Sequence, residues 1–502
     1  MNLSIIILII LIFFFFLKKN NNRIRSINSK IPGPIGLPII GNLLQLKTEP
    51  HQVLFQWYEK YGPIFSIRMG SIDTVILSGY PIIKRALKDN PRIFTNRYEY
   101  WSKIQMNNAS NLMMSNGNQH SILRKTVHSE LTTIRVKKLE SYIVREVEKL
   151  CKILDQHCQD GTSFSMNPYG NIFSLNIVVR FLFGLDIEYN DEKMKEFSKI
   201  VSSLFDSAGT PIISDFIPLA RPFENFKGDR FKIVYNNISS YIESFVNEYK
   251  LKKQNGLIDE ENDSTIVGKL LKEFENGSIS WDNLIGTLSD ICAGGGDTVA
   301  DSITFALIAL TNNSSCQEKL YNEIKKSLIK NNDDCDNENK DVFVIKHSIY
   351  RSLIPYLSMV IKETYRLFPV ALLTLPNVTD QDFEIDGYKI AKGTKIIKNI
   401  LVSHRSKDFF PSPNSFIPER FIETGNNFMF GCGDTNSLQF GIGTRDCIGK
   451  SLADCEMFTA IATLINRYEF INPTPSKPYD ELGTPCLSLQ PCHANFIIKK
   501  RK

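Results

Sequence analysis

The sequence predicts a mainly α-helical protein with a smaller β region, and three observations carry this prediction. Helical periodicity dominates from about residue 80 to residue 370. Two short runs of β-forming residues, 64–69 and 74–77, flank a Gly-Ser pair and therefore predict a hairpin. Residues 280–311 predict one central helix that would span about 45 Å. A hydrophobic content of 42% allows a large core.

The N-terminus carries an apolar run that predicts a membrane anchor. Residues 3–17 are apolar except for one serine, and Lys18 and Lys19 follow directly. A helix of that length reaches about 22 Å, and snorkelling lysines and local thinning can bridge the rest of the bilayer. Because the charges follow the run, we expect an uncleaved single-pass anchor over residues 1–20 and a cytosolic body. A cleaved signal peptide and a surface-lying helix are the alternatives.

The segment after the anchor predicts a linker. Residues 21–38 are basic and then rich in proline and glycine, which give a stiff, non-helical lead-in at 31–38. Residues 39–502 are then expected to form the main domain. At its end, Lys499-Lys500 is either a solvated basic tail or a retrieval signal of the endoplasmic reticulum.

The charge distribution excludes nucleic acid as the main partner. The net charge is +5, but the first 48 residues hold six basic and no acidic residues, and the last four are all basic. The body between them is therefore net negative and offers no counter-charge to a phosphate backbone. The ten cysteines contain no Cys-x-x-Cys pair, which argues against a disulfide framework and a zinc ribbon.

The predicted central helix contains three consecutive glycines, which lower its stability. Ser280 is a suitable N-cap, and the segment is apolar nearly all round in its second half, so it should be buried. Gly294, Gly295 and Gly296 sit in its middle and together cost about 3 kcal/mol relative to alanine. Either something approaches the helix backbone closely, or the segment is broken into two shorter helices.

The most specific motif surrounds Cys447. Residues 440–449 read Phe-Gly-Ile-Gly-Thr-Arg-Asp-Cys-Ile-Gly, and a helix-like stretch, 451–458, follows. A cysteine before a helix N-terminus is expected to favour its thiolate, although a structural thiol is the alternative. At its Phe, Gly, Gly, Arg, Cys and Gly positions, the decapeptide resembles the cysteine-ligand loop of the cytochrome P450 (haem-thiolate) family.

Further motifs extend this resemblance over residues 31–502. Glu363 and Arg366 are similar to the family's Glu-x-x-Arg pair, and 418–421 are similar to its Pro-Glu-Arg-Phe segment. Helical periodicity alone predicts an exposed ion pair at 363 and 366. The resemblance implies instead a buried triad with Arg420, and it implies the cytochrome P450 fold.

The same resemblance implies the catalytic residues. The three glycines followed by Asp297 and Thr298 are similar to the oxygen-binding segment of the family's central helix. There the glycines leave room for dioxygen, the Thr298 hydroxyl would lie beside it, and Asp297 would relay protons. Val299 stands where a second threonine is common.

The implied cofactor is haem b. Cys447 would be the axial thiolate ligand of the iron, and Arg445 and Arg124 would face the haem propionates. His120 replaces a common tryptophan, and either donates a hydrogen bond to a propionate or is a solvated surface residue. Asn377 stands where the family often has arginine, so haem retention is expected to rest more on Arg124 and Arg445.

The resemblance implies a monooxygenase. It would insert one oxygen atom from dioxygen into a lipophilic small molecule, with electrons from an NADPH-cytochrome reductase, a flavoprotein, at the endoplasmic reticulum membrane. The alternatives are a haem-thiolate isomerase or lyase acting on peroxides, and a non-catalytic haem sensor. The basic clusters 124–125 and 135–138 either steer an acidic redox partner or are solvated helix faces. Nominated substrate segments are 97–118 (Tyr98, Trp101, Met106, Met113, Met114), 204–218 (Phe205, Gly209, Phe216), 371–375 and Leu487.

Overall fold

The computed structural model describes residues 22–47, 49–105, 110–208, 212–224, 229–258, 265–331, 342–372, 374–422, 438–481, 483–485 and 488–501. The predicted anchor, 1–20, lies outside the described residues, as do Met106, Gly209 and Leu487, and the side chain of Phe205 is not described.

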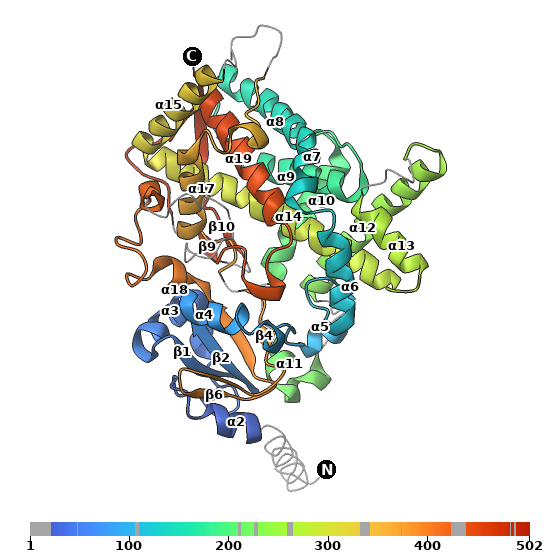
Figure 1. The fold of residues 1–502 in the computed structure, drawn as a ribbon, viewed down its shortest axis with the longest axis vertical. Helices are drawn as coiled ribbons and strands as arrows, with labels where there is room; N and C mark the ends of the chain where they lie inside the picture. The colour runs from blue at the N-terminus through green and yellow to red at the C-terminus, as the bar shows by residue number, and fades with distance from the viewer. Residues whose placement is uncertain are drawn as a thin grey trace.

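Helices make up most of the described chain, which confirms the mainly α prediction. Figure 1 shows the long helices packed together above a β-rich lower end. Their bounds are α2 (Asn22–Asn28), α3 (Pro50–Tyr61), α4 (Tyr80–Leu87), α5 (Trp101–Gln105), α6 (Gly117–His128), α7 (Thr133–Lys138), α8 (Glu140–Asp160), α9 (Asn167–Phe183), α10 (Glu192–Ala208), α11 (Ile213–Phe216), α12 (Arg230–Gln254), α13 (Ile266–Glu275), α14 (Trp281–Asn312), α15 (Ser314–Lys330), α16 (His347–Tyr350), α17 (Pro355–Leu367), α18 (Ile400–Arg405) and α19 (Lys450–Arg467).

The main sheet has four strands in the order β1-β2-β7-β4. Strands β1 (Ile64–Met69) and β2 (Ile72–Ser78) pair antiparallel, which confirms the predicted hairpin. Strand β7 (Lys395–Asn399) pairs parallel with β2 and antiparallel with β4 (Asn377–Val378). The remaining strands are β3 (Phe164–Ser165), β5 (Phe383–Ile385), β6 (Tyr388–Ile390), β8 (Tyr468–Ile471), β9 (Thr484–Pro485), β10 (Leu489–Gln490) and β11 (Asn495–Lys500).

Both ends of the described chain are attached to the body. Within the predicted linker, 21–38, α2 forms a short helix, and the Asn28 side chain donates a hydrogen bond to the Thr394 hydroxyl at 2.9 Å. At the other end, Lys499 and Lys500 belong to β11, which pairs with β8. Strand pairing thus holds the backbone of this lysine pair, while both side chains are exposed to solvent, as the solvated basic tail predicts.

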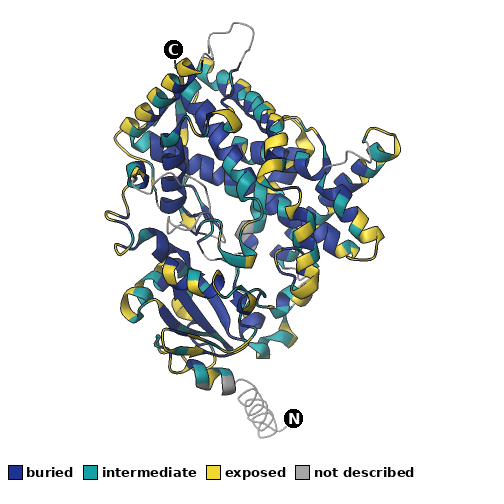
Figure 2. Ribbon diagram, in the orientation of Figure 1, coloured by how far each residue is buried: buried dark blue, intermediate teal, exposed yellow. Residues whose placement is uncertain are grey.

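The predicted central helix is continuous, so the two-helix alternative is wrong. Helix α14 begins after Ser280, whose side chain accepts from the Asn283 backbone N–H while the Asn283 side chain accepts from the Ser280 N–H. This capping box satisfies two groups that a helix start leaves without partners. Helix α14 crosses the molecule and packs against α9, α10, α17 and α19, and Figure 2 shows the buried residues of these helices around it.

Two of the three glycines in α14 permit close helix packing. A Cβ on Gly295 would lie 2.5 Å from a Val178 methyl group of α9, and one on Gly296 would lie 3.3 Å from a Leu175 methyl group. A Cβ on Gly294 would meet nothing within 4 Å. The prediction that something approaches this backbone is thus confirmed for α9, whereas the space beside Gly294 is open to a ligand.

The triad implied by the resemblance is present and buried. Arg366 donates from Nε to one oxygen of Glu363 at 2.7 Å and from Nη2 to the other at 2.8 Å. Arg420, in the 3-10 turn η6 (Pro418–Phe421), donates to Glu363 Oε1 at 3.0 Å. The exposed ion pair that periodicity predicts is wrong, because other elements cover α17 on all sides and bury every residue from Tyr356 to Leu367.

Candidate functional site

Backbone geometry fixes the loop that carries Cys447. The Cys447 N–H donates to the Phe440 carbonyl at 2.7 Å and closes the loop just before α19. Gly441 and Gly443 have positive φ angles of 70° and 83°, which favour glycine. A Cβ on Gly443 would also lie 2.5 Å from the Leu87 carbonyl oxygen. Glycine at these positions therefore serves the loop conformation.

The Cys447 side chain is accessible, although the helix that follows it is deeply buried. Burial by the surrounding protein raises the pKa of the Cys447 thiol, and a hydrogen bond from the Gly449 N–H opposes this rise. Without a metal ion, desolvation therefore opposes the thiolate that the N-terminus of the following helix favours. A thiolate here needs a further positive charge, which a bound metal ion supplies.

Thr298 and Asp297 are neighbours in sequence, but their side chains make different contacts. The Thr298 hydroxyl donates to the Gly294 carbonyl at 2.8 Å, one turn earlier, so it shares a helix face with the open position at Gly294. Asp297 is buried and accepts from the Ser202 hydroxyl of α10 at 2.6 Å. The structure thus places the hydroxyl beside the open space and ties the acid to α10.

Arg445 and Arg124 lie in the Cys447 loop and on α6. Arg445 donates to the carbonyl oxygens of Thr95 at 2.8 Å and Ser115 at 2.6 Å. Arg124 donates to the Asp446 carbonyl at 3.0 Å and forms an ion pair with the Asp446 carboxylate. Arg124 is therefore neutralised within the loop, whereas Arg445 makes no ion pair within the described part of the chain.

His120 is buried beside these arginines. Its side chain lies on α6, and burial, followed by the charges of Arg445, Arg124 and Arg97, lowers its pKa to about 3. The solvated-surface alternative for His120 is therefore wrong. A neutral imidazole in this position keeps one N–H donor and adds no further charge to a cationic region.

Two further cations join this cluster, and sequence reasoning missed both. Arg97 donates to the Leu375 carbonyl at 2.9 Å and to the Asn377 side-chain oxygen at 3.3 Å. Lys398 donates to the same two oxygens, at 3.0 and 2.6 Å. Neither residue carried a sequence signal for this role, because Lys398 is one of two lysines in the strand 395–399 and Arg97 belongs to no recognised motif.

Arg97, Lys398 and Arg445 form a cationic cluster that has no carboxylate partner among the described residues. Among the described residues none of the three pairs with a carboxylate, and their acceptors are neutral carbonyl and amide oxygens. Burial and the neighbouring arginines lower the pKa of Arg97 to about 9 and that of Arg445 to about 10. Such a group is costly unless an acidic ligand completes it.

The nominated substrate segments meet around a buried lysine. Tyr98, from segment 97–118, and Phe216, from segment 204–218, lie with Tyr100 around the Lys395 ammonium, at 4.8 to 5.7 Å from nitrogen to ring centre. Burial lowers the pKa of Lys395 to about 7. The structure thus brings two of the nominated segments together on the β7 side of the molecule.

Asp290 ties the segment 97–118 to α14 and was not found from sequence. It accepts from the Asn111 side chain at 2.9 Å and from the Met113 N–H at 2.7 Å. Asp290 lies one turn before Gly294, so this contact fixes the loop above the open face of α14. Burial raises the pKa of Asp290 to about 8.

The basic clusters divide into paired arginines and exposed lysines. Arg124 pairs with Asp446, and Arg135 pairs with Glu130 at 3.3 Å. Helix α7 also contacts the start of α19, where the Thr133 and Ser451 hydroxyls are 3.1 Å apart. The exposed lysines near the Cys447 loop are Lys125, Lys137 and Lys138.

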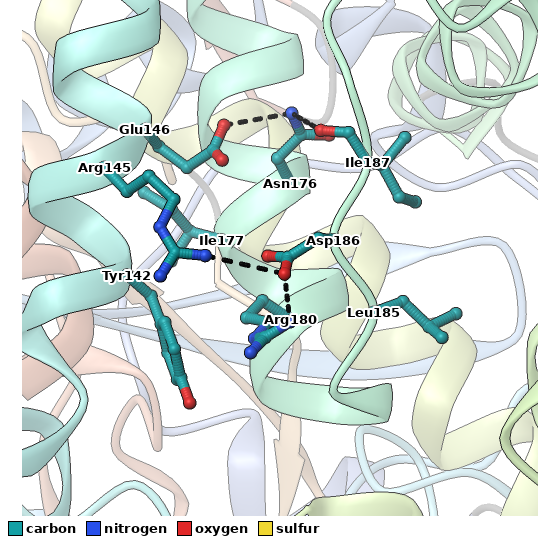
Figure 3. Close-up of a pocket in the computed structure, with 9 residues that line it drawn as sticks. All are labelled: Tyr142, Arg145, Glu146, Asn176, Ile177, Arg180, Leu185, Asp186 and Ile187. Carbon is teal, nitrogen blue, oxygen red and sulfur yellow. Dashed lines mark hydrogen bonds and ion pairs between the residues drawn. The ribbon is translucent and has the colours of Figure 1, made fainter. Parts of the chain in front are cut away.

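Two other features resemble sites but are not connected with Cys447. The pocket in Figure 3 lies between α8, α9 and residues 185–187, and the ion pair of Arg180 and Asp186 at 2.6 Å occupies it. The side chains of Glu140, His347 and Cys455 meet near α19. Burial raises the pKa of the Cys455 thiol. The seven described cysteines are all free, as expected.

One described helix, α14, has the length and composition to cross a membrane. In its most apolar window 78% of the residues are buried inside the protein, so here it is a core helix.

Comparison with known proteins places this site in a family. The family description "Cytochrome P450" matches residues 31–497. Three proteins of Dictyostelium discoideum are similar over nearly the whole chain: probable cytochrome P450 513E1 (51% identical, 95% of each chain), 513A3 (47%, 94% of this chain and 95% of the relative) and 513A1 (44%, 95% and 96%).

Cytochrome P450 proteins hold haem through a cysteine thiolate, and the family is one of haem-thiolate monooxygenases. The extent of the match, together with the mainly α fold and its smaller sheets, shows that this chain belongs to the cytochrome P450 family.

Proposed function

We propose that this protein uses haem b, held by Cys447, to insert one atom of dioxygen into a lipophilic small molecule. The observation that carries the proposal is an accessible cysteine together with a cationic cluster that has no carboxylate partner in the described part of the chain. Haem fits both, because its iron binds thiolate and its two propionates are anions. When bound, the iron activates dioxygen.

The chain's own residues have distinct roles in this proposal. Arg97 and Arg445 bind the propionates, and His120 offers one neutral N–H donor beside them. Arg124 positions the loop through Asp446. This division supports the propionate roles expected for Arg445 and His120, and assigns Arg124 to the loop instead.

Thr298 and Asp297 manage protons in the proposed reaction. The Thr298 hydroxyl lies on the open Gly294 face and can exchange its bond to the Gly294 carbonyl for one to a ligand. Asp297 and the Ser202 hydroxyl form a hydrogen-bonded pair that can carry a proton from the α10 side. The open helix face supports a catalytic site over a closed haem sensor.

We assign electron supply to an NADPH-dependent flavoprotein reductase. Lys125, Lys137 and Lys138 are exposed near the Cys447 loop and can attract an acidic partner. The apolar segment 1–20 supports a membrane anchor, followed by the linker 21–38 and the catalytic domain 39–502, at the endoplasmic reticulum. Aromatic side chains around segments 97–118 and 204–218 favour a lipophilic substrate.

Replacing the proposed ligand tests the assignment. Cys447→Ser should abolish the red-shifted carbon monoxide band of the reduced protein, because the thiolate causes that shift. Cys455→Ser, on the buried face of α19, is the matched control and should keep the band. An unchanged spectrum of Cys447→Ser would show that another residue holds the iron.

Replacing the hydroxyl tests the reaction class. In the reconstituted system with reductase, NADPH and labelled dioxygen, the wild type should place one labelled oxygen atom in its product. Thr298→Ala should keep haem but release most reducing equivalents as hydrogen peroxide. Thr304→Ala, whose hydroxyl bonds the Ala300 carbonyl at 3.0 Å, is the control. Full coupling in Thr298→Ala would contradict the role, and turnover of peroxides without NADPH would favour an isomerase or lyase.

A further inference from the structure

Lys398 is a buried lysine with no carboxylate partner among the described residues. It is buried in β7, and its ammonium bonds only the Leu375 carbonyl at 3.0 Å and the Asn377 amide oxygen at 2.6 Å. Arg97 uses the same two acceptors. Two cations therefore share two neutral oxygens, and neither pairs with a carboxylate among the described residues. Such an arrangement repels itself unless an anion lies between the two groups.

The strand register explains how Lys398 reaches this point. Strands β4 and β7 are antiparallel, with Asn377 opposite Ile396. Residue 398 is two positions further along the same face, and diagonal neighbours of this kind are within reach of long side chains. A long side chain at 398 can therefore occupy the space that a long side chain at 377 would take. Lys395, three positions away, points to the opposite face, where aromatic rings surround it.

The residue at position 377 bears on the role of Lys398. Asn377 stands where the family resemblance implies an arginine, which predicts a missing positive charge. The structure places the Lys398 ammonium 2.6 Å from that asparagine's oxygen. The Asn377 side chain is itself fixed, because its amide donates to the Phe94 carbonyl at 2.6 Å. The positive charge is thus still present, but the neighbouring strand carries it.

We infer that Lys398 is a haem-propionate residue of this chain, so that strand β7 and not strand β4 carries the cation. Its ammonium and the Arg97 guanidinium bind one propionate together, and Asn377 orients both cations. This inference rests on the proposed haem site. It also changes the expectation that haem retention rests more heavily on Arg124 and Arg445, because Lys398 supplies a further cation.

The decisive measurement is haem loss from the purified holoprotein to excess apomyoglobin. Lys398→Met should release haem about 10- to 100-fold faster, which corresponds to losing one hydrogen bond between charged groups. The haem-free protein should become more resistant to urea, because the variant removes an unpaired buried charge. The resonance Raman propionate bending band should shift as well.

Two further variants separate a ligand role from a structural one. Lys395→Met removes the other buried lysine of β7; it should stabilise the haem-free protein similarly and leave haem loss and the propionate band unchanged. Asn377→Arg combined with Lys398→Met returns the charge to β4 and should restore slow haem loss. If Lys398→Met does not fold, Lys398→Gln provides the same comparison.

Each outcome decides the inference. Haem loss at the wild-type rate from Lys398→Met, or equal acceleration in Lys395→Met, would overturn it. Failure of Asn377→Arg to restore retention would also count against it. A wild-type protein that takes up no haem would instead overturn the proposed function.

Discussion

Two buried arginine clusters in this protein solve the same electrostatic problem in opposite ways. Around Glu363, two guanidiniums share one carboxylate, and the charge is balanced inside the chain. In the cationic cluster of Arg97, Lys398 and Arg445, the oxygens that accept hydrogen bonds from these side chains are neutral. The first cluster is complete without a ligand, whereas the second is complete only with an acidic one.

The difference shows which features serve the chain and which serve its ligand. A buried arginine stays protonated, so its positive charge is stabilised only by a nearby anion. Glu363 is that anion for Arg366 and Arg420, and the three residues tie α17 to η6. In the proposed haem site the cationic cluster supplies its charges to the cofactor, which we expect to lower the stability of the haem-free protein.

The largest effect should follow from breaking the self-contained cluster. Glu363→Gln leaves two buried guanidiniums without an anion and should lower the free energy of unfolding by about 3–5 kcal/mol, with haem or without it. Urea denaturation followed by circular dichroism measures the loss. Glu419→Gln is the matched control; its partner Lys319 is at the surface, so the loss should stay below about 1 kcal/mol. Equal losses would mean that Glu363 does not carry the cluster.

Glu456 is a buried acid with no ion-pair partner among the described residues. Unlike a buried arginine, its carboxyl group can become neutral, because it can bind a proton. Glu456 in α19 bonds the Ser174 hydroxyl at 3.0 Å, and burial raises its pKa to about 8. The unfolded group titrates near 4.5, so the stability it contributes is full below that pH and is lost as pH rises towards 8.

Glu456→Gln should therefore reduce the pH dependence of unfolding. Between pH 6 and 8 the variant should lose about 2 kcal/mol less stability than the wild type, since about 1.4 kcal/mol accompanies each proton and pH unit. Asp290, which also has a raised pKa, should leave a residual slope in the same direction. Urea midpoints across this pH range test the expectation, and identical slopes would contradict it.

The smallest expected effect on stability distinguishes Gly295, which packs against the chain, from Gly294, which faces open space. Gly295→Ala places a methyl group 2.5 Å from a Val178 methyl group and should cost a net of about 1 kcal/mol, since overpacking exceeds the helix gain. Gly294→Ala meets nothing and should stabilise the haem-free protein by somewhat less than 1 kcal/mol.

Binding of carbon monoxide to the holoproteins completes this comparison of glycines. Gly294→Ala should slow carbon monoxide association after flash photolysis, because its methyl group enters the open space, and Gly295→Ala should leave the rate unchanged. The reverse pattern would mean that the open face of α14 does not receive the ligand.

Local patterns predicted the main elements well. The hairpin, the capped central helix and the Cys447 loop each depend on residues close in sequence, where backbone preferences act directly. Glu363 shows where this reasoning fails. Periodicity places it on an exposed face, but α17 has no exposed face once other elements cover it. Only the family resemblance predicted that Glu363 is buried, because a family motif reflects a shared tertiary structure.

The sequence by itself determined the family, the cysteine loop and the absence of one arginine at position 377. Tertiary structure alone decided that the Lys398 ammonium lies against Asn377, that Asp446 forms an ion pair with Arg124 and that His120 is buried. The reason is physical: the energy of a charge depends on its distance to other charges and on its burial, and residues 97, 377, 398 and 445 meet only after folding.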